Sequence, residues 1–251
     1  MIELLIAVGV MCAINTVLAI LLVIADATIA NYGECHITIN DRKTVTVTGG
    51  RPLLSVLKEQ QIFIPSACGG RGSCGLCKVT VREGAGALLA TEMPWLSPEE
   101  QKANVRLSCQ VKVKRDLNLW IPEELLSVKQ YQTQVVGLSE LTHDIKEVKL
   151  KLIDPPAIAF DAGQFIQIEV PPYALTDEPV YRAYSVSSDP AETGQIELEI
   201  RYVPNGICTT YVHKYLKVGQ TLVLNGPYGE FYLRDAPRDI VCVAGGSGMA
   251  P

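Results

Sequence analysis

The stretch CGGRGSCGLC, residues 68–77, carries three cysteines within ten residues. Cys68, Cys74 and Cys77 have the spacing C-x5-C-x2-C, and the next cysteine, Cys109, follows after 31 residues. Structural zinc sites usually join two short pairs of cysteine or histidine, whereas here one compact loop is closed by a single distant thiolate. Four thiolates arranged in this way favour a [2Fe–2S] cluster, with zinc or disulfides as the alternatives.

Glycines fill the positions between these cysteines, at Gly69, Gly70, Gly72 and Gly75. Glycine tolerates positive φ and allows close approach of the backbone, so N–H groups of the loop can reach the cluster sulfurs. The glycines therefore support a loop that wraps closely around its cofactor.

The flanking sequence predicts the elements that hold this loop. Strand-like alternation occupies residues 35–40, 43–49, 78–84 and 111–122. Residues 53–61 have helical spacing, and Ser97 starts a second helix with proline at N1 and glutamate at N3. This order, with the cysteine spacing, resembles the ferredoxin β-grasp fold. We predict an α+β [2Fe–2S] domain at residues 34–127, with Cys68, Cys74, Cys77 and Cys109 as cluster ligands.

Beyond Ser127 the sequence changes to short strand candidates separated by turns, at residues 132–139, 146–153, 163–171, 195–203 and 220–227. Strands at this spacing favour a small antiparallel β-barrel, which we place at residues 128–237.

Two segments within the predicted barrel could bind a nucleotide cofactor. In RAYS, residues 182–185, the arginine could make paired hydrogen bonds to a pyrophosphate. In GICTTYVHKYL, residues 206–216, a helix opening at residues 208–210 would aim free N–H groups at phosphate oxygens. R-x-Y-S alone would also fit an ordinary strand with a solvated arginine.

Together with GPYG at residues 226–229, these segments resemble the FAD-binding signatures of the ferredoxin reductase family. The resemblance implies that Arg182 binds the FAD pyrophosphate, Tyr184 packs on the isoalloxazine ring and Ser185 hydrogen-bonds near its reactive nitrogen. The other implied FAD-binding residues are Gly206, Cys208, Thr209 and Thr210.

The carboxyl-terminal sequence DIVCVAGGSGMAP predicts a buried strand at residues 240–244 followed by a glycine loop. We place the start of an α/β NADH-binding domain at residues 238–251, with Gly245, Gly246 and Gly248 contacting the nucleotide. A parallel strand needs neighbours to bury it, so we expect the chain to be a fragment with an incomplete NADH site and unknown catalytic residues.

Residues 4–25 contain no charged side chain and would span about 33 Å as a helix, which suits a bilayer core. We predict a transmembrane helix at residues 1–27. A signal peptide is the alternative, because residues 25–27 have a small-x-small pattern, but no positive charge precedes the apolar run. A buried soluble helix is seldom apolar on every face.

The cluster requires reduced thiols, which places the C-terminal domains in the cytoplasm. The net charge of −5 and the absence of a basic stripe predict no nucleic-acid partner.

The order of anchor, ferredoxin domain, FAD barrel and NADH domain resembles the F subunits of bacterial sodium-translocating NADH:quinone oxidoreductases, along the whole chain. The resemblance implies electron input from NADH through FAD to the [2Fe–2S] cluster. It also implies inner-membrane partner subunits that reduce a quinone such as ubiquinone and export sodium. An oxygenase reductase component and a non-enzymatic electron-carrier fragment are the alternatives.

Overall fold

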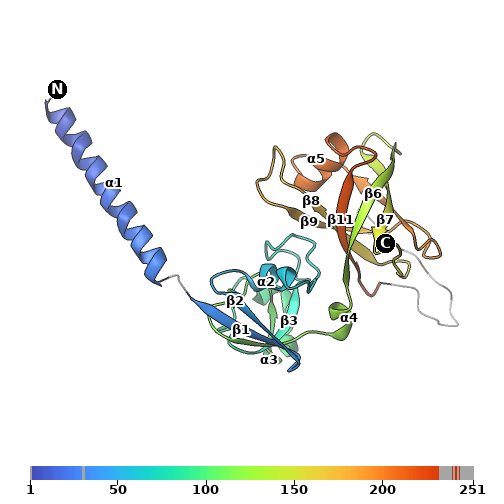
Figure 1. Ribbon diagram of the computed structural model, residues 1–251, viewed down its shortest axis with the longest axis horizontal. Coiled ribbons are helices and arrows are strands. Elements are labelled where there is room, and N and C mark those ends of the chain that lie inside the picture. The colour runs from blue at the N-terminus through green and yellow to red at the C-terminus, as the bar shows by residue number, and fades with distance from the viewer. Residues whose placement is uncertain (1, 30–31, 232–238, 240, 242, 244–251) are drawn as a thin grey trace.

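The computed structural model describes residues 2–29, 32–231, 239, 241 and 243. Within these residues, Figure 1 shows an N-terminal helix that stands apart, a domain built on a five-stranded sheet, and a domain built on a six-stranded sheet.

The N-terminal helix, α1 (Ile2–Ile29), is 28 residues long. Its segment Ile6–Val23 is long and apolar enough to cross a membrane, and none of it is buried against the rest of the protein. Figure 1 shows α1 extending away from both domains. The helix is thus available to a membrane, as predicted from its composition.

The first sheet has the strand order β2-β1-β5-β3-β4. Its strands are β1 (Glu34–Ile39), β2 (Lys43–Thr48), β3 (Lys78–Glu83), β4 (Val105–Leu107) and β5 (Leu117–Trp120). β1 and β5 are parallel, whereas the other neighbouring strands are antiparallel. The β1–β2 turn uses Asn40 and Asp41 at positive φ, a conformation that these two residue types tolerate better than most.

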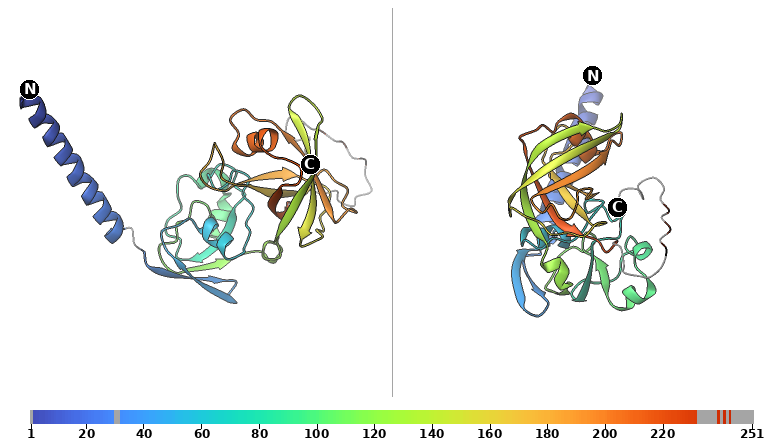
Figure 2. Two further views of the ribbon diagram at one scale, coloured as in Figure 1. Left: turned by 45° about the horizontal axis from the view of Figure 1, so that its top comes forward. Right: turned by 90° about the vertical axis from the view of Figure 1, so that its right-hand side faces the viewer.

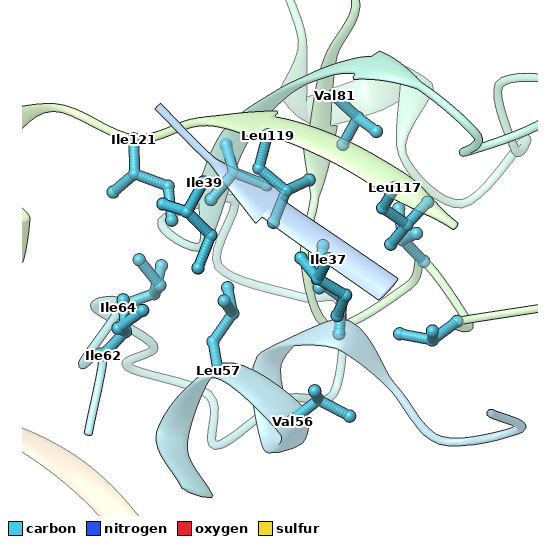
Figure 3. Packing of buried hydrophobic residues seen from close by; sticks show 14 of the residues in the cluster. Ile37, Ile39, Val56, Leu57, Ile62, Ile64, Val81, Leu117, Leu119 and Ile121 are labelled. Carbon is cyan, nitrogen blue, oxygen red and sulfur yellow. The ribbon is translucent and has the colours of Figure 1, made fainter. Parts of the chain in front are cut away.

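The short helices of this domain are α2 (Leu53–Glu59), η1 (Met93–Trp95), α3 (Pro98–Lys102) and α4 (Glu123–Leu126). Figure 3 shows Val56 and Leu57 of α2 directed toward the side chains of β1 and β5. The predicted start of α3 is confirmed: the Ser97 hydroxyl accepts the Glu100 N–H, and the Glu100 carboxylate accepts the Ser97 N–H.

The predicted strand at residues 111–122 is shorter than expected, because only Leu117–Trp120 forms β5. Val111 and Val113 are nevertheless buried. Their backbone groups bond to the segment before α2, with Leu53 N–H donating to Val111 O and Val113 N–H donating to Arg51 O. Alternating burial in this segment therefore accompanies a short antiparallel bridge between Pro52 and Lys112, which lies outside the five-stranded sheet.

The second sheet is antiparallel throughout, with the order β10-β7-β6-β11-β8-β9. Its strands are β6 (Lys129–Glu140), β7 (Ile145–Asp154), β8 (Phe165–Val170), β9 (Val180–Ser185), β10 (Gln195–Arg201) and β11 (Thr221–Tyr228). Just beyond β9, Ser187 N–H donates to Glu197 O of β10 at 2.9 Å, which joins the two edges. The sheet thus curls into the predicted barrel, and Figure 2 shows its strands crossing as they do so.

Helix α5 (Ile207–Lys214) packs against the barrel through Cys208, Tyr211 and Val212, which belong to the same buried cluster as the strand side chains. This contact fixes the start of α5 beside β9, because Cys208 Sγ donates to Val180 O at 3.6 Å.

The predicted nucleotide loop residues Gly245, Gly246 and Gly248 lie outside the described residues. Of the strand predicted at residues 240–244, only Val241 and Val243 belong to the described residues, and they are 85% and 91% exposed. Residues 240, 242 and 244 of this predicted strand lie outside the described residues, so the strand stays a prediction.

Candidate functional site

The four predicted cluster ligands meet as two pairs of thiols. Cys68 is in hydrogen-bonding contact with Cys74, and Cys77 is in the same kind of contact with Cys109. The pairs are near enough for the charge on Cys68 to influence Cys109. All four are free thiols.

Secondary structure sets these positions. The first three cysteines lie on the loop between α2 and β3, and Cys109 follows β4. Ser108 joins the two segments, because both its N–H and its hydroxyl donate to Cys77 O, at 2.8 and 3.0 Å. Gln110 Nε2 donates to Cys109 Sγ at 3.6 Å. The β3–β4 pairing therefore brings the distant fourth cysteine to the loop.

Several ligand thiols have perturbed acidity. Burial raises the pKa of Cys68, but hydrogen bonds from Ser73, Cys74 and Arg71 outweigh it and lower the pKa to about 6. A hydrogen bond from the Cys77 thiol, partly opposed by burial, lowers the pKa of Cys109 to about 7. The hydrogen bond with Cys109, followed by burial, raises the pKa of Cys77. The loop thus supplies donors that stabilise sulfur anions.

The arrangement of the four thiols fits a two-iron cluster. Among the described residues, no three His, Cys, Asp or Glu side chains converge on a point that could hold one metal ion. Two adjacent thiol pairs instead match a [2Fe–2S] cluster, whose two irons share four cysteine ligands.

The loop glycines have a role that the sequence did not predict. A Cβ on Gly72 would lie 2.6 Å from Gln110 Nε2, and one on Gly75 would lie 2.8 Å from Trp95. A Cβ on Gly69 would overlap Arg182 Nη1 and lie 3.0 Å from the carbonyl oxygen of Tyr181, both in the barrel. Gly69 therefore allows the cluster loop to approach the other domain closely.

A cavity of about 530 Å³ lies between the two domains. Ser66, Gly69 and Arg71 of the cluster loop line it, together with residues 176–182 of the barrel and Ile207 at the start of α5. Arg182 thus shares one cavity with the helix end that we predicted to face phosphate. The helix has eight residues and no side-chain cap at Gly206. Its first N–H groups lack partners within the helix, so they can meet an anion.

Four other predicted FAD residues, Tyr184, Ser185, Cys208 and Thr209, have different surroundings. Tyr184 is partly buried in the barrel core, where desolvation raises its pKa. Cys208 is 2% exposed, and burial raises its pKa to about 11. Thr209 holds the preceding turn, because its hydroxyl donates to Val203 O and accepts the Val203 N–H, both at 3.2 Å. Ser185 pairs with Phe165 at the end of β9. None of these four side chains lines the cavity.

The site can accept an anionic cofactor such as FAD. Thr210 Oγ1 is buried at the first turn of α5 and has no hydrogen-bond partner among the described residues. The Arg182 guanidinium reaches the cavity, with Nη1 donating to Tyr181 O at 2.7 Å. The guanidinium and the uncapped helix start line the cavity and can bind a pyrophosphate, whereas Thr210 is not among the lining residues.

Sequence reasoning missed the residues that join the two domains. Lys58 of α2 lies 3.7 Å from the centre of the Tyr181 ring and 3.9 Å from Glu169 Oε2. Ser66 N–H donates to Gln167 Oε1 at 2.8 Å. On the barrel these residues occupy outward-facing strand positions, which predict solvent exposure. They are covered by the ferredoxin domain, and no pattern in the neighbouring sequence predicts such a contact between domains.

Two family models match the chain, and each covers one domain. The 2Fe-2S iron-sulfur cluster binding domain matches residues 37–114, and the oxidoreductase FAD-binding domain matches residues 132–232. The chain therefore contains a domain of each type, as the resemblances predicted.

The chain is also similar to curated proteins over nearly its whole length. It is 37% identical to the F subunit of the Na(+)-translocating NADH-quinone reductase of Neisseria gonorrhoeae, across 93% of this chain and 66% of that protein. It is 35% identical to the corresponding protein of Neisseria meningitidis serogroup C, across 99% of this chain and 70% of that protein. The chain thus spans about two thirds of the length of these relatives, slightly less in the first case.

Among solved structures, the cytochrome P450 reductase of Amycolatopsis matches with a TM-score of 0.61 and 25% identity. The match covers 86% of this chain and 65% of that structure. The likeness extends across most of the chain, as expected for the combination of ferredoxin domain and FAD barrel.

Proposed function

Because this chain belongs to the family of F subunits of Na(+)-translocating NADH-quinone reductases, we propose that it takes electrons from NADH and delivers them singly to a membrane-bound quinone reductase. When bound, FAD supplies the exchange between two-electron and one-electron transfer, and the [2Fe–2S] cluster accepts one electron at a time. The observation that carries the proposal is the contact between the cluster loop and the flavin strand β9, where Gly69 lies against Arg182.

The chain's own residues have three roles in this proposal. Cys68, Cys74, Cys77 and Cys109 hold the cluster. Arg182 and the first turn of α5 bind the pyrophosphate of FAD, while Tyr184 and Ser185 orient its ring system. The close packing at Gly69 brings the cluster loop against Arg182 and so shortens the path between the two cofactors.

We further propose that α1 spans the inner membrane once, with both domains in the cytoplasm, and that it docks this module on partner subunits. The length and apolar composition of α1 support the span. Sodium export belongs to those partners, because α1 carries no charged side chain between residues 4 and 25 that could form an ion path.

The proposal is tested on the detergent-purified protein with a complete NADH-binding domain, because we expect this chain to hold only part of the NADH site. Iron, acid-labile sulfide and FAD are counted per chain, and NADH-driven reduction of the cluster is followed by its visible absorption. We expect two irons, two sulfides and one FAD, with cluster reduction that requires FAD. Zinc in place of iron, or a cluster that NADH cannot reduce, would overturn it.

Arg182→Ala tests the flavin site, with Arg201→Ala as the matched control. Arg201 is exposed on β10 and pairs with Asp144 at 2.7 Å, away from the cavity. Loss of the pyrophosphate contact should weaken FAD binding about tenfold or more, as for a charge-assisted hydrogen bond, whereas the control should bind FAD normally. Full FAD affinity in Arg182→Ala would exclude the assigned role.

The second candidate is an oxygenase reductase component, which the likeness to the P450 reductase structure favours. It would contain the same cofactors but deliver electrons to a soluble acceptor. A membrane fraction that reduces quinone with this chain, and loses that activity when the chain is removed, distinguishes the first candidate from the second. Cluster reduction by NADH also separates both from a non-enzymatic electron carrier.

A further inference from the structure

A buried chain of hydrogen bonds joins the cluster loop to the barrel. Ser66 N–H donates to Gln167 Oε1 at 2.8 Å, and Gln167 Nε2 donates to Asn225 Oδ1 at 3.0 Å. The Tyr228 hydroxyl donates to the same Asn225 oxygen at 2.6 Å. Ser66, Gln167 and Asn225 are at most 4% exposed, and all three also line the cavity between the two domains.

Ser66 is itself part of the cluster loop. Its hydroxyl accepts the Gly70 N–H at 2.9 Å, and its carbonyl accepts the Gly69 N–H at 3.1 Å. It lies two residues before Cys68. One residue therefore organises the loop on one side and contacts the other domain through its own N–H.

Gln167 occupies a strand position that would usually face solvent. Its neighbours Ile166 and Ile168 are fully buried in the barrel core, so Gln167 faces outward from β8. In the register with β9 it lies opposite Ala183, between the predicted flavin residues Arg182 and Tyr184. Gln167 thus connects the strand beside the predicted flavin site to the cluster loop through a single hydrogen bond.

The amide of Gln167 uses both of its ends at once. Its oxygen accepts from the ferredoxin domain and its nitrogen donates within the barrel. Asn225 and Tyr228 fix which way the amide points, because Asn225 Oδ1 accepts from both neighbours. The barrel therefore presents a preoriented acceptor that the docked cluster loop satisfies, and separating the domains exposes both partners.

We propose that Gln167 is a positioning residue that locks the cluster loop onto the flavin barrel and so sets the rate of electron transfer between the two cofactors. The rate effect rests on the proposed function, whereas the docking effect does not. Asn225 and Tyr228 act through Gln167 by orienting its amide.

The test is Gln167→Met, which keeps the length of the side chain but removes both hydrogen bonds. Two quantities are measured in the detergent-purified chain: amide hydrogen exchange of the peptide that contains Ser66, and the rate of cluster bleaching after a light flash that reduces the flavin. We expect about tenfold faster exchange and about tenfold slower bleaching, the change that corresponds to one lost hydrogen bond. Iron content should stay at the parent level, and bleaching is expressed per bound flavin because Gln167 also lines the cavity.

Two further variants make the result specific. Gln134→Met is the same substitution at an exposed position on β6, where Gln134 Nε2 donates to Gly219 O. This variant should behave as the parent. Gln167→Glu restores an acceptor for the Ser66 N–H and should recover most of the protection from exchange. Should Gln167→Met fail to fold, Asn225→Leu removes only the group that orients the amide and should give about threefold changes in the same direction.

The inference would be overturned if a folded Gln167→Met showed the hydrogen exchange and bleaching rates of the parent. It would also be overturned if Gln134→Met changed both rates as much as Gln167→Met does. Absence of any flavin-to-cluster transfer in the parent chain would instead count against the proposed function. In that case the exchange measurement alone decides whether Gln167 docks the loop.

Discussion

At the scale of single residues, the cysteine assignment depends on which thiols meet. Cys74 contacts Cys68, whereas Cys35 is buried in the same domain and bonds to Tyr32 O, at 3.8 Å. Two cysteines of one domain thus have different surroundings, and they form a matched pair for substitution.

Cys74→Ala should abolish the cluster and leave FAD bound, because the flavin site lies in the barrel. Cys35→Ala should keep both cofactors. Iron content and visible absorption of the purified chain measure this directly. Intact iron–sulfur absorption in Cys74→Ala would refute its role as a ligand.

Gly69 offers a second comparison, with Gly86. Both have positive φ, at 67° and 73°, but a Cβ on Gly86 would meet nothing within 4 Å. Gly86→Ala should therefore cost only the left-handed conformation, about 1 kcal/mol. Gly69→Ala also forces a Cβ against the carbonyl of Tyr181, and overpacking of this kind adds about 1–3 kcal/mol. Thermal unfolding of the two variants checks the difference; equal losses would mean that the domains are not packed at Gly69.

At the scale of elements, the segment that leads into α3 is held by one buried ion pair. Arg106 of β4 and Glu92 lie 2.6 Å apart, with side chains 5% and 0% exposed. Glu92 also accepts the N–H groups of Leu89 and Leu107, and Arg106 donates to the carbonyl oxygens of Gly86 and Ala87. This network supports η1, whose Trp95 packs against Gly75 of the cluster loop.

Arg106→Met should therefore destabilise the domain strongly, by about 3–5 kcal/mol, because it leaves Glu92 buried and unpaired. Arg82→Met is the control: Arg82 pairs with Asp41 at a similar distance, but the side chains are 45% and 61% exposed, and such pairs contribute at most about 1 kcal/mol. Urea unfolding of both variants gives the two values. A loss below about 1 kcal/mol for Arg106→Met would show that water enters this site.

The elements themselves were largely predictable from sequence, for physical reasons. Alternation of polar and apolar residues predicted β1, β2 and β3, and the capping residues predicted the start of α3. Both signals depend only on residues close together in the sequence. At Val111 and Val113 the alternation reflects a short antiparallel bridge to residues 51–53, outside the five-stranded sheet. Gln167 could not be recognised as an interface residue, since its burial depends on a second domain about 100 residues away in the chain.

At the scale of the whole molecule, two domains share a buried interface while α1 stands apart from both of them (Figure 1). The interface includes a small apolar cluster of Phe63, Val128 and Tyr228, which belong to the cluster-loop side, the linker and β11. The two cofactor domains therefore behave as one unit, and the helix is not part of it.

Removing residues 1–31 should give a protein that stays in solution without detergent and keeps both cofactors.

The membrane orientation is the last prediction, and it follows from the thiols. The four cluster cysteines and Cys35 are free, which suits a reducing compartment. An added protease should therefore digest the two domains in inverted membrane vesicles and leave them intact in right-side-out vesicles. Detection uses an antibody against the barrel, and detergent serves as the control because it should allow digestion in both preparations. Digestion in right-side-out vesicles alone would place the cluster outside the cytoplasm, where its thiols would be exposed to oxidation, and would contradict electron input from cytoplasmic NADH.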